Sequence, residues 1–367
     1  MKVLFTGGGT GGHVYPALAL ARYLREQEGA EVLFVGTPRG MEAQIVPAEG
    51  FPLELIPVEG LTRRFSLRVG RAVFLAGAAV LKARRLLKNF HPDVVVGTGG
   101  YVAGPVVLAA WLAGIPTVIH EQNAIPGLTN VWLSRLASRT CLSFPGSEKY
   151  FPNQKKTVLT GNPRATEAAG AATAPPPAEP PLDGKRPVLL CVGGSHGAAK
   201  INEAFSAALE AVLTSCQVQV VYITGRRYYA ELAAKLSRLQ ERYRTSLHVL
   251  PYHAELPVLL SRTSLLVSRA GATTLAELTA LGVPAILIPS PNVTNNHQEY
   301  NARLLAENGA AVLLREQELS AAGLAASLVE LLSDRKRLAA MAAASRALGV
   351  PDAAARMTAV IRSVSRR

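Results

Sequence analysis

Short apolar runs that end in glycine or polar residues alternate along this chain with longer stretches of helical periodicity. An apolar run of about four to eight residues between turn residues is typical of a buried strand, whereas apolar residues spaced three or four apart are typical of a helix. The pattern therefore predicts an α/β fold with parallel sheets and right-handed crossovers. The predicted strands lie within residues 3–6, 31–37, 93–100, 116–123, 140–144, 156–163, 187–192, 218–225, 247–252, 263–268, 283–290 and 310–316.

The alternation is interrupted at residues 165–186, which are rich in alanine and proline and lack periodicity. Such a composition is typical of a partly extended linker. The opening arrangement of apolar strand, glycine turn and helix then returns at residues 187–205. We therefore expect two Rossmann-like domains, 1–164 and 187–350, whose parallel sheets face each other across a cleft. Residues 351–367 predict a basic amphipathic helix that packs back on the first domain.

The turn after the first predicted strand is dominated by glycine. Five of the six residues 7–12 are glycine, and His13 follows them. Such a turn lets backbone N–H groups approach an anion at the N-terminus of the next helix. It also satisfies G-x-G-x-x-G, but the second predicted strand is followed by Arg39 rather than by an acidic residue, which disfavours a nicotinamide dinucleotide. His13 can either take a proton beside the anion or brace its own helix.

Composition narrows the class of protein. The chain has 367 residues, of which 49% are hydrophobic, so it can bury two cores. Its three cysteines lack metal-like spacing and indicate a reducing compartment. Neither a signal peptide nor an apolar run of about 20 residues is present, so we expect a cytoplasmic protein that is not integral to a membrane.

The formal net charge of +13 calls for an anionic partner, and part of the excess is local. Between residues 61 and 90 there are eight basic residues and no acidic one. On a helix, Arg71, Lys82 and Arg85 share the outward half with Phe74 and Leu75. Apolar and basic side chains on one outward face are typical of a surface that lies on anionic lipid, and a solvated basic helix is the alternative. Nucleic acid is disfavoured because no known binding module is present.

Polar residues follow predicted strands in both halves. His120 to Asn123 come directly after an apolar strand, and residues 268–277 join a strand to a helix in the second half. Thr273 and Thr274, near the start of that helix, can cap it or help its N–H groups to hold a diphosphate. Glu277 suits a ribose diol, and the amide of Gln298 suits sugar hydroxyls.

Seven motifs follow one another along nearly the whole chain: GGTGGH, GTGGYVAGP, HEQNAIPGLTN, GNP-Arg, GGSHGA, SRAGATTLAE and HQEYNA. Their order resembles that of the MurG family of bacterial peptidoglycan glycosyltransferases, glycosyltransferase family 28. The resemblance implies a GT-B fold and inverting transfer of N-acetylglucosamine (GlcNAc) from UDP-GlcNAc to the N-acetylmuramic acid (MurNAc) 4-hydroxyl of lipid I, which is undecaprenyl-diphospho-MurNAc-pentapeptide. The product would be lipid II, with a β-1,4 link, made by a peripheral protein at the cytoplasmic face of the membrane.

The resemblance also implies roles for individual residues. The acceptor diphosphate would face Gly99, Gly100 and Tyr101. The residues implied to contact UDP-GlcNAc are Thr10, Gly11, Gly12, Asn123, Arg164, Ser195, His253, Ala272, Thr273, Thr274, Leu275, Ala276, Glu277 and Gln298. Three departures weaken the match, because Arg164 follows Pro163 without the usual intervening residue, His253 lies where an acidic pair is usual, and Asn296 stands where aspartate is common.

The implied reaction needs a base for the acceptor hydroxyl, and His13 is the first candidate, with Glu121 as its rival. The four aspartates are too far apart in sequence for a D-x-D metal clamp, so we expect no cofactor and no obligatory metal. Helix N-termini and hydroxyls would then meet the charge of the leaving diphosphate. A UDP-GlcNAc 2-epimerase, another GT-B transferase with a different acceptor and a non-catalytic subunit are the alternatives.

Overall fold

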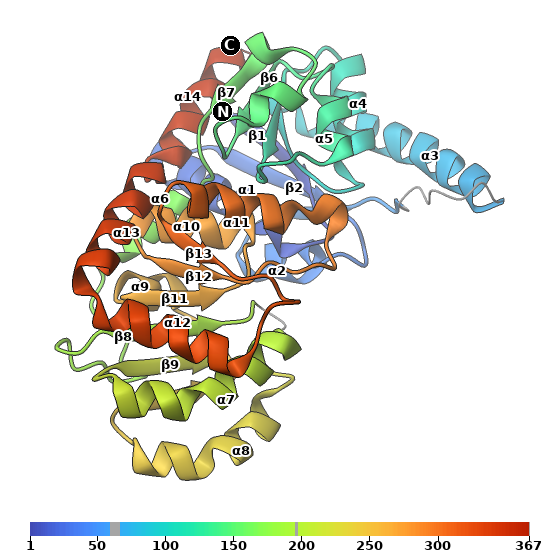
Figure 1. Ribbon diagram of the computed structural model, residues 1–367. Helices are drawn as coiled ribbons and strands as arrows, with labels where there is room; N and C mark the ends of the chain where they lie inside the picture. Colours follow the sequence, from blue (N-terminus) through green and yellow to red (C-terminus); the bar gives the residue numbers. More distant parts are fainter. Residues whose placement is uncertain (59–66, 195–196, 367) are drawn as a thin grey trace. The chain divides into compact units, whose positions relative to one another are not determined.

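The computed structural model describes residues 1–58, 67–194 and 197–366, with residues 67–76 described for their backbone only. The chain divides into two compact units (Figure 1). Unit 1 comprises Met1–Thr166 and Asp352–Arg367, and unit 2 comprises Glu167–Pro351.

Unit 1 is built on a parallel sheet whose described strands run in the order β3-β2-β1-β4-β5-β6-β7. The order reverses between β1 and β4, so the loops that follow these two strands emerge side by side. The strands span Lys2–Gly7 (β1), Glu31–Gly36 (β2), Leu53–Leu55 (β3), Val94–Gly99 (β4), Thr117–Glu121 (β5), Arg139–Leu142 (β6) and Thr157–Leu159 (β7).

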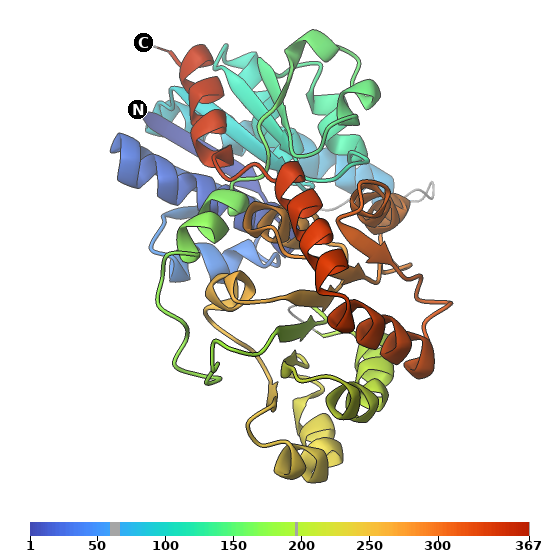
Figure 2. The same ribbon diagram turned by 60° about the vertical axis from the view of Figure 1, so that its left-hand side comes forward.

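Helices cover both faces of this sheet because its strands are apolar on both sides. Val3 and Phe5 face α1 and α14, whereas Leu4 faces α3 and α4. Helix α14 therefore packs beside α1 within unit 1 (Figure 2). The N-terminal part of α3 extends beyond α4 (Figure 1). The helices of unit 1 span Gly11–Glu28 (α1), Glu42–Ala48 (α2), Leu67–Phe90 (α3), Ala103–Leu112 (α4), Leu128–Leu133 (α5) and Ala353–Val364 (α14). Helix α6, Arg164–Ala171, begins in unit 1 and continues into unit 2.

Unit 2 repeats this plan with the described strand order β10-β9-β8-β11-β12-β13, again parallel. Its main core joins these strands to α7, α8 and α12. The strands span Val188–Val192 (β8), Gln219–Ile223 (β9), Leu247–Leu250 (β10), Leu265–Ser268 (β11), Ala285–Leu287 (β12) and Ala311–Leu313 (β13). The helices span Ala199–Ser215 (α7), Tyr229–Arg242 (α8), Leu256–Ser261 (α9), Ala272–Leu281 (α10), His297–Glu307 (α11), Ala321–Ser333 (α12) and Arg335–Leu348 (α13).

The predicted α/β class with two parallel sheets is confirmed. Strand β3 is an addition, since no strand was predicted at residues 53–55. The first residues of the predicted linker at residues 165–186 are helical, since they belong to α6. Alanine favours helix, and Ala165 and Ala168 are fully or nearly buried in α6.

Candidate active site

In unit 1, the loops after β1 and β4 are joined by a hydrogen bond at the reversal point of the sheet. The Gly8 N–H donates to the Gly99 carbonyl over 3.2 Å. The first of these loops leads into α1, whose preceding residue Thr10 makes no side-chain capping hydrogen bond. The N-terminus of α1, formed by Gly11 and Gly12, therefore keeps the partial positive charge that favours an anion.

His13 lies in the first turn of α1, where its ring is held by the backbone of the glycine turn. Its Nδ1 lies 3.0 Å from the Gly8 carbonyl oxygen, which can only accept, so Nδ1 carries the proton. The Thr10 hydroxyl lies 3.4 Å from the same nitrogen. The neutral ring then presents Nε2 as a proton acceptor beside Gly99, where an added Cβ would lie only 3.0 Å from Nε2. This tautomer suits a general base.

A buried carboxylate that the sequence analysis missed lies beside the same turn. Glu42, on α2, is only 1% exposed and accepts hydrogen bonds from the N–H groups of Gly9 and Thr37, each over 2.8 Å. The Thr37 hydroxyl donates a third, over 2.7 Å. The Gly8 and Gly9 N–H groups are thus engaged within the protein. Of the glycine turn, only the N-terminus of α1 is therefore left as the place where the expected anion would bind.

His120, near the end of β5, is fully buried, and its imidazole is neutral. Burial lowers the pKa of His120 to about 4, the hydrogen bond to Gly161 opposes this shift, and nearby His13 lowers the pKa further. The His120 Nε2 lies 3.0 Å from the Ser143 hydroxyl, and its Nδ1 lies 3.2 Å from the amide nitrogen of Gln122. His120 therefore serves as a fixed, uncharged neighbour of His13.

Glu121, the rival candidate base, is 1% exposed and engaged at both of its oxygens. Oε1 accepts from the backbone and side-chain N–H groups of Asn123, over 2.9 and 3.2 Å. Oε2 accepts from the Gly127 N–H over 3.1 Å and from the Asn130 amide over 2.8 Å. These contacts tie the loop between β5 and α5 to the sheet, which disfavours Glu121 as a base. Asn123 is part of this network.

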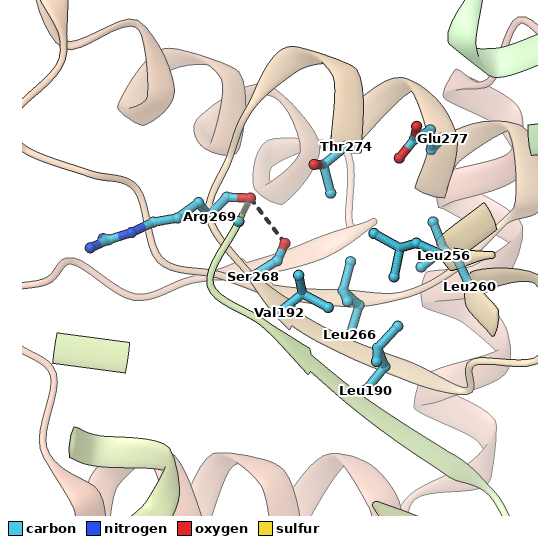
Figure 3. A pocket seen from close by; sticks show the side chains of 10 residues that line it. Leu190, Val192, Leu256, Leu260, Leu266, Ser268, Arg269, Thr274 and Glu277 are labelled. Atoms are coloured by element: carbon cyan, nitrogen blue, oxygen red, sulfur yellow. Dashed lines mark hydrogen bonds between the residues drawn. The ribbon is translucent and has the colours of Figure 1, made fainter. Parts of the chain in front are cut away.

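Unit 2 has a pocket at its own reversal point, between the ends of β8 and β11. Thr274 and Glu277, both on α10, line it above a floor of apolar side chains from β8, β11 and α9 (Figure 3). The Arg269 side chain extends away from these two residues (Figure 3). The N-cap residue of α10 is Gly271, which has no side chain that could cap the helix. The site therefore combines an apolar floor, a helix N-terminus and a carboxylate.

Of the other residues expected to contact UDP-GlcNAc, Ala272, Thr273, Leu275 and Ala276 lie on α10. Leu275 is fully buried and Ala272 nearly so, which leaves mainly their backbone for contacts, and Thr273 and Ala276 are half-buried. The Gln298 side-chain oxygen accepts from the Ser290 N–H over 2.9 Å. His253 lies 2.7 Å from the Glu179 carbonyl oxygen through Nε2. Ser195 lies outside the described residues.

Arg164 and Tyr101 are two further residues of unit 1 that are expected to contact a substrate. The Arg164 guanidinium lies over the ring of Tyr15, 5.9 Å from its centre. Tyr101 is 64% exposed and follows Gly99 and Gly100 in the loop after β4.

The predicted lipid-facing surface on α3 is only partly described. Lys82 and Arg85 are exposed, and the Lys82 ammonium donates to the Leu55 carbonyl over 2.8 Å. Arg71, Phe74 and Leu75 have side chains outside the described set. Leu81 on α3 and Trp111 and Leu112 on α4 are exposed apolar residues that were not predicted from the sequence, and α4 packs against α3.

The described residues contain neither a metal-binding cluster nor a helix that could span a membrane. No group of three or more His, Cys, Asp or Glu side chains there could hold a metal ion. Within the same part of the chain, no helix combines the length and apolarity that a membrane crossing needs.

Comparison with known proteins identifies the family. Residues 3–142 match the glycosyltransferase family 28 N-terminal domain, and residues 188–357 match the glycosyltransferase family 28 C-terminal domain. The chain belongs to glycosyltransferase family 28. Both reversal points described above lie within the matched domains.

Full-length relatives of family 28 are similar throughout. A protein of Natranaerobius thermophilus is 44% identical over 368 residues, covering 99% of this chain and 100% of that protein. A protein of Listeria monocytogenes is 46% identical over 370 residues, covering 99% of each. Both are named UDP-N-acetylglucosamine–N-acetylmuramyl-(pentapeptide) pyrophosphoryl-undecaprenol N-acetylglucosamine transferase.

Solved structures agree with this family assignment. MurG of Acinetobacter baumannii matches with a TM-score of 0.77 and 32% identity over 99% of both chains. A putative UDP-N-acetylglucosamine 2-epimerase of Listeria monocytogenes matches with a TM-score of 0.71 but only 16% identity, covering 99% of this chain and 96% of that one. At that identity the epimerase shares the fold alone.

Proposed function

We propose that this family 28 protein transfers GlcNAc from UDP-GlcNAc to the MurNAc 4-hydroxyl of lipid I, forming the β-1,4 link of lipid II. The observation that carries the proposal is the full-length similarity to relatives named for this transfer, at 44% and 46% identity. The epimerase alternative has only the fold in its favour.

In the proposed reaction, the acceptor 4-hydroxyl oxygen attacks the anomeric carbon of GlcNAc. The bond from that carbon to the diphosphate oxygen breaks, its electron pair leaves with UDP, and the hydroxyl proton passes to Nε2 of His13. The 3.0 Å contact between His13 Nδ1 and the Gly8 carbonyl supports this role because, in the neutral imidazole, it places the lone pair on Nε2. Attack on the face opposite the leaving group inverts the anomeric centre.

The donor is assigned to unit 2. The pocket beside α10 supports this assignment, since its leucine and valine floor suits a uracil ring and Glu277 suits the ribose hydroxyls. The N-terminus of α10 and the Thr274 hydroxyl would meet the charge on the departing diphosphate. Gln298, whose oxygen is engaged by Ser290, would direct its amide N–H groups to the sugar. No step in this scheme requires a metal or another cofactor.

The acceptor is assigned to unit 1, with the loop of Gly99 to Tyr101 near its diphosphate. A lipid-linked acceptor requires the protein to reach the membrane, and we assign it to the cytoplasmic face as a peripheral protein. Exposed Leu81 beside exposed Arg85 on α3, with Trp111 on the adjoining α4, supports contact with anionic lipid. Sedimentation with anionic vesicles, and not with zwitterionic ones, is the expected result.

Transfer of radiolabelled GlcNAc from UDP-GlcNAc to a short-chain lipid I analogue, by the purified protein in EDTA, tests the proposal. Labelled disaccharide-lipid is the expected product. If no transfer occurs with or without magnesium while UDP-GlcNAc still binds, the acceptor assignment is wrong. Conversion of UDP-GlcNAc alone to its 2-epimer would instead identify an epimerase.

A further inference from the structure

The peptide group between Gly8 and Gly9 is hydrogen-bonded at both of its ends. Its carbonyl oxygen faces His13 Nδ1 at 3.0 Å, and its N–H donates to Glu42 Oε2 over 2.8 Å. We infer that Glu42 is a positioning residue that acts on His13 through this one peptide group. The inference rests on the proposed role of His13 as the base of the transfer.

Glu42 is enclosed by the loops that it joins. At 1% exposure its carboxylate is removed from water, and it accepts from Gly9, from the Thr37 N–H and from the Thr37 hydroxyl. A Cβ at Gly8 or Gly40 would overlap the Glu42 carboxylate, so the chain there fits closely around this group. Within the described residues no lysine or arginine pairs with Glu42, so these donors stabilise its charge.

The hydrogen bond from the Gly9 N–H to Glu42 polarises the peptide group that contacts His13. A carboxylate that accepts from a peptide N–H polarises that peptide and makes its carbonyl oxygen a stronger acceptor, because linked hydrogen bonds reinforce one another. The stronger acceptor holds the proton of His13 on Nδ1, which leaves the lone pair on Nε2. A carboxylate bonded directly to a histidine has the same effect in serine proteases. Here a peptide group stands between the two side chains.

The other ionisable groups around His13 do not replace this contact. His120, on β5, is neutral because burial lowers its pKa to about 4. Glu121 directs both oxygens to Asn123, Gly127 and Asn130. Glu42 is therefore the carboxylate, among the described residues, that reaches His13 through a shared peptide.

The test combines a structural and a kinetic measurement on the full-length protein. Nitrogen-15 NMR of histidine-labelled protein reports which ring nitrogen of neutral His13 carries the proton, and His13→Ala assigns the signal. The wild-type ring is expected to be the Nδ1–H tautomer. In Glu42→Gln the Nε2–H tautomer should rise, and kcat should fall about 10- to 100-fold with KM changed less than about twofold.

Glu49→Gln is the matched control, because it removes an exposed carboxylate directly after the same helix, where Glu49 pairs only with Arg22 among the described residues. It should leave both the tautomer and kcat unchanged. An Nε2–H tautomer in the wild type would overturn the inference even if Glu42→Gln did not fold. So would an unchanged His13 tautomer in folded Glu42→Gln, whatever happens to kcat. A changed tautomer with full activity would instead refute His13 as the base. It would still support the effect of Glu42 on the His13 tautomer.

Discussion

Replacing Glu121 by glutamine tests whether its carboxylate has a structural or a catalytic role. In the structure each Glu121 oxygen accepts two hydrogen bonds, from Asn123 on one side and from Gly127 and Asn130 on the other. Glutamine has the same shape, but its NH2 group must face the donors on one side. Two buried or half-buried donors then lose their acceptor.

The size of the effect follows from these contacts. A buried donor left without an acceptor costs about 1 to 3 kcal/mol. Since the Asn123 side is half-buried, glutamine would place its NH2 group there, and we expect unit 1 to lose about 2 to 4 kcal/mol in its free energy of unfolding. Urea unfolding followed by a unit 1 probe, such as the fluorescence of Trp132, measures this loss. In the folded Glu121→Gln protein, kcat should fall less than about tenfold, because His13, the proposed proton acceptor, is still present.

Glu54→Gln serves as the control, since Glu54 is exposed on β3 and its substitution should change stability by less than about 0.5 kcal/mol. The opposite pattern would refute the reasoning. A Glu121→Gln protein of wild-type stability whose kcat falls about 100-fold or more, as expected for loss of a general base, would make Glu121 the base.

His13→Ala should lower kcat about 10²- to 10⁴-fold with little change in either KM, and an unchanged kcat would exclude His13 as the base. Glu277→Ala should raise the KM for UDP-GlcNAc about tenfold or more, because its carboxylate lines the proposed donor pocket, and Ser195→Ala should raise this KM less strongly. Steady-state kinetics at varied UDP-GlcNAc concentrations measure both effects, and a change in the acceptor KM alone would contradict the donor assignment. His120 makes stability depend on pH: its folded pKa of about 4 lies below the unfolded value of about 6.5, so the unfolded chain binds more protons between these values. The contribution, about 3 kcal/mol, is fully present above pH 6.5 and is lost as the pH falls to about 4. Urea titrations of His120→Gln should show a weaker pH dependence in this window, and an equal dependence would refute the assignment.

The fold was largely predictable because the central strands of both sheets are apolar and buried. Val94–Val96 in β4 and Val188–Val192 in β8 are uninterrupted apolar segments, each bounded by glycine or polar residues nearby. Strand β3 escaped prediction because it has three residues at the sheet edge, with only partly buried side chains between two prolines. Helix α6 escaped because alanine was interpreted together with the prolines that follow, although on its own it favours helix.

The site was less predictable, since sequence spacing does not reveal which polar groups become neighbours. The position of His13 at a helix start follows from the glycine turn that precedes it. Its hydrogen bond to Gly8 and its tautomer depend on the folded turn. Glu121 follows an apolar strand, as a substrate-facing residue would, and only the structure reveals that four donors surround it.

Two glutamates, Glu42 on α2 of unit 1 and Glu277 on α10 of unit 2, show why a glycine turn alone does not define an anion site. Glu42 is held by the turn of unit 1 and takes up the Gly9 N–H, so its negative charge would repel a diphosphate placed at Gly8 and Gly9. An anion near this turn is favoured only farther along, at the N-terminus of α1 around Thr10 to Gly12. Glu277 lines a pocket, and its proposed role is to meet hydroxyl groups of the donor. In the proposed mechanism, the turn of unit 1 therefore acts chiefly by orienting His13, and the helix N-termini would recognise the diphosphate.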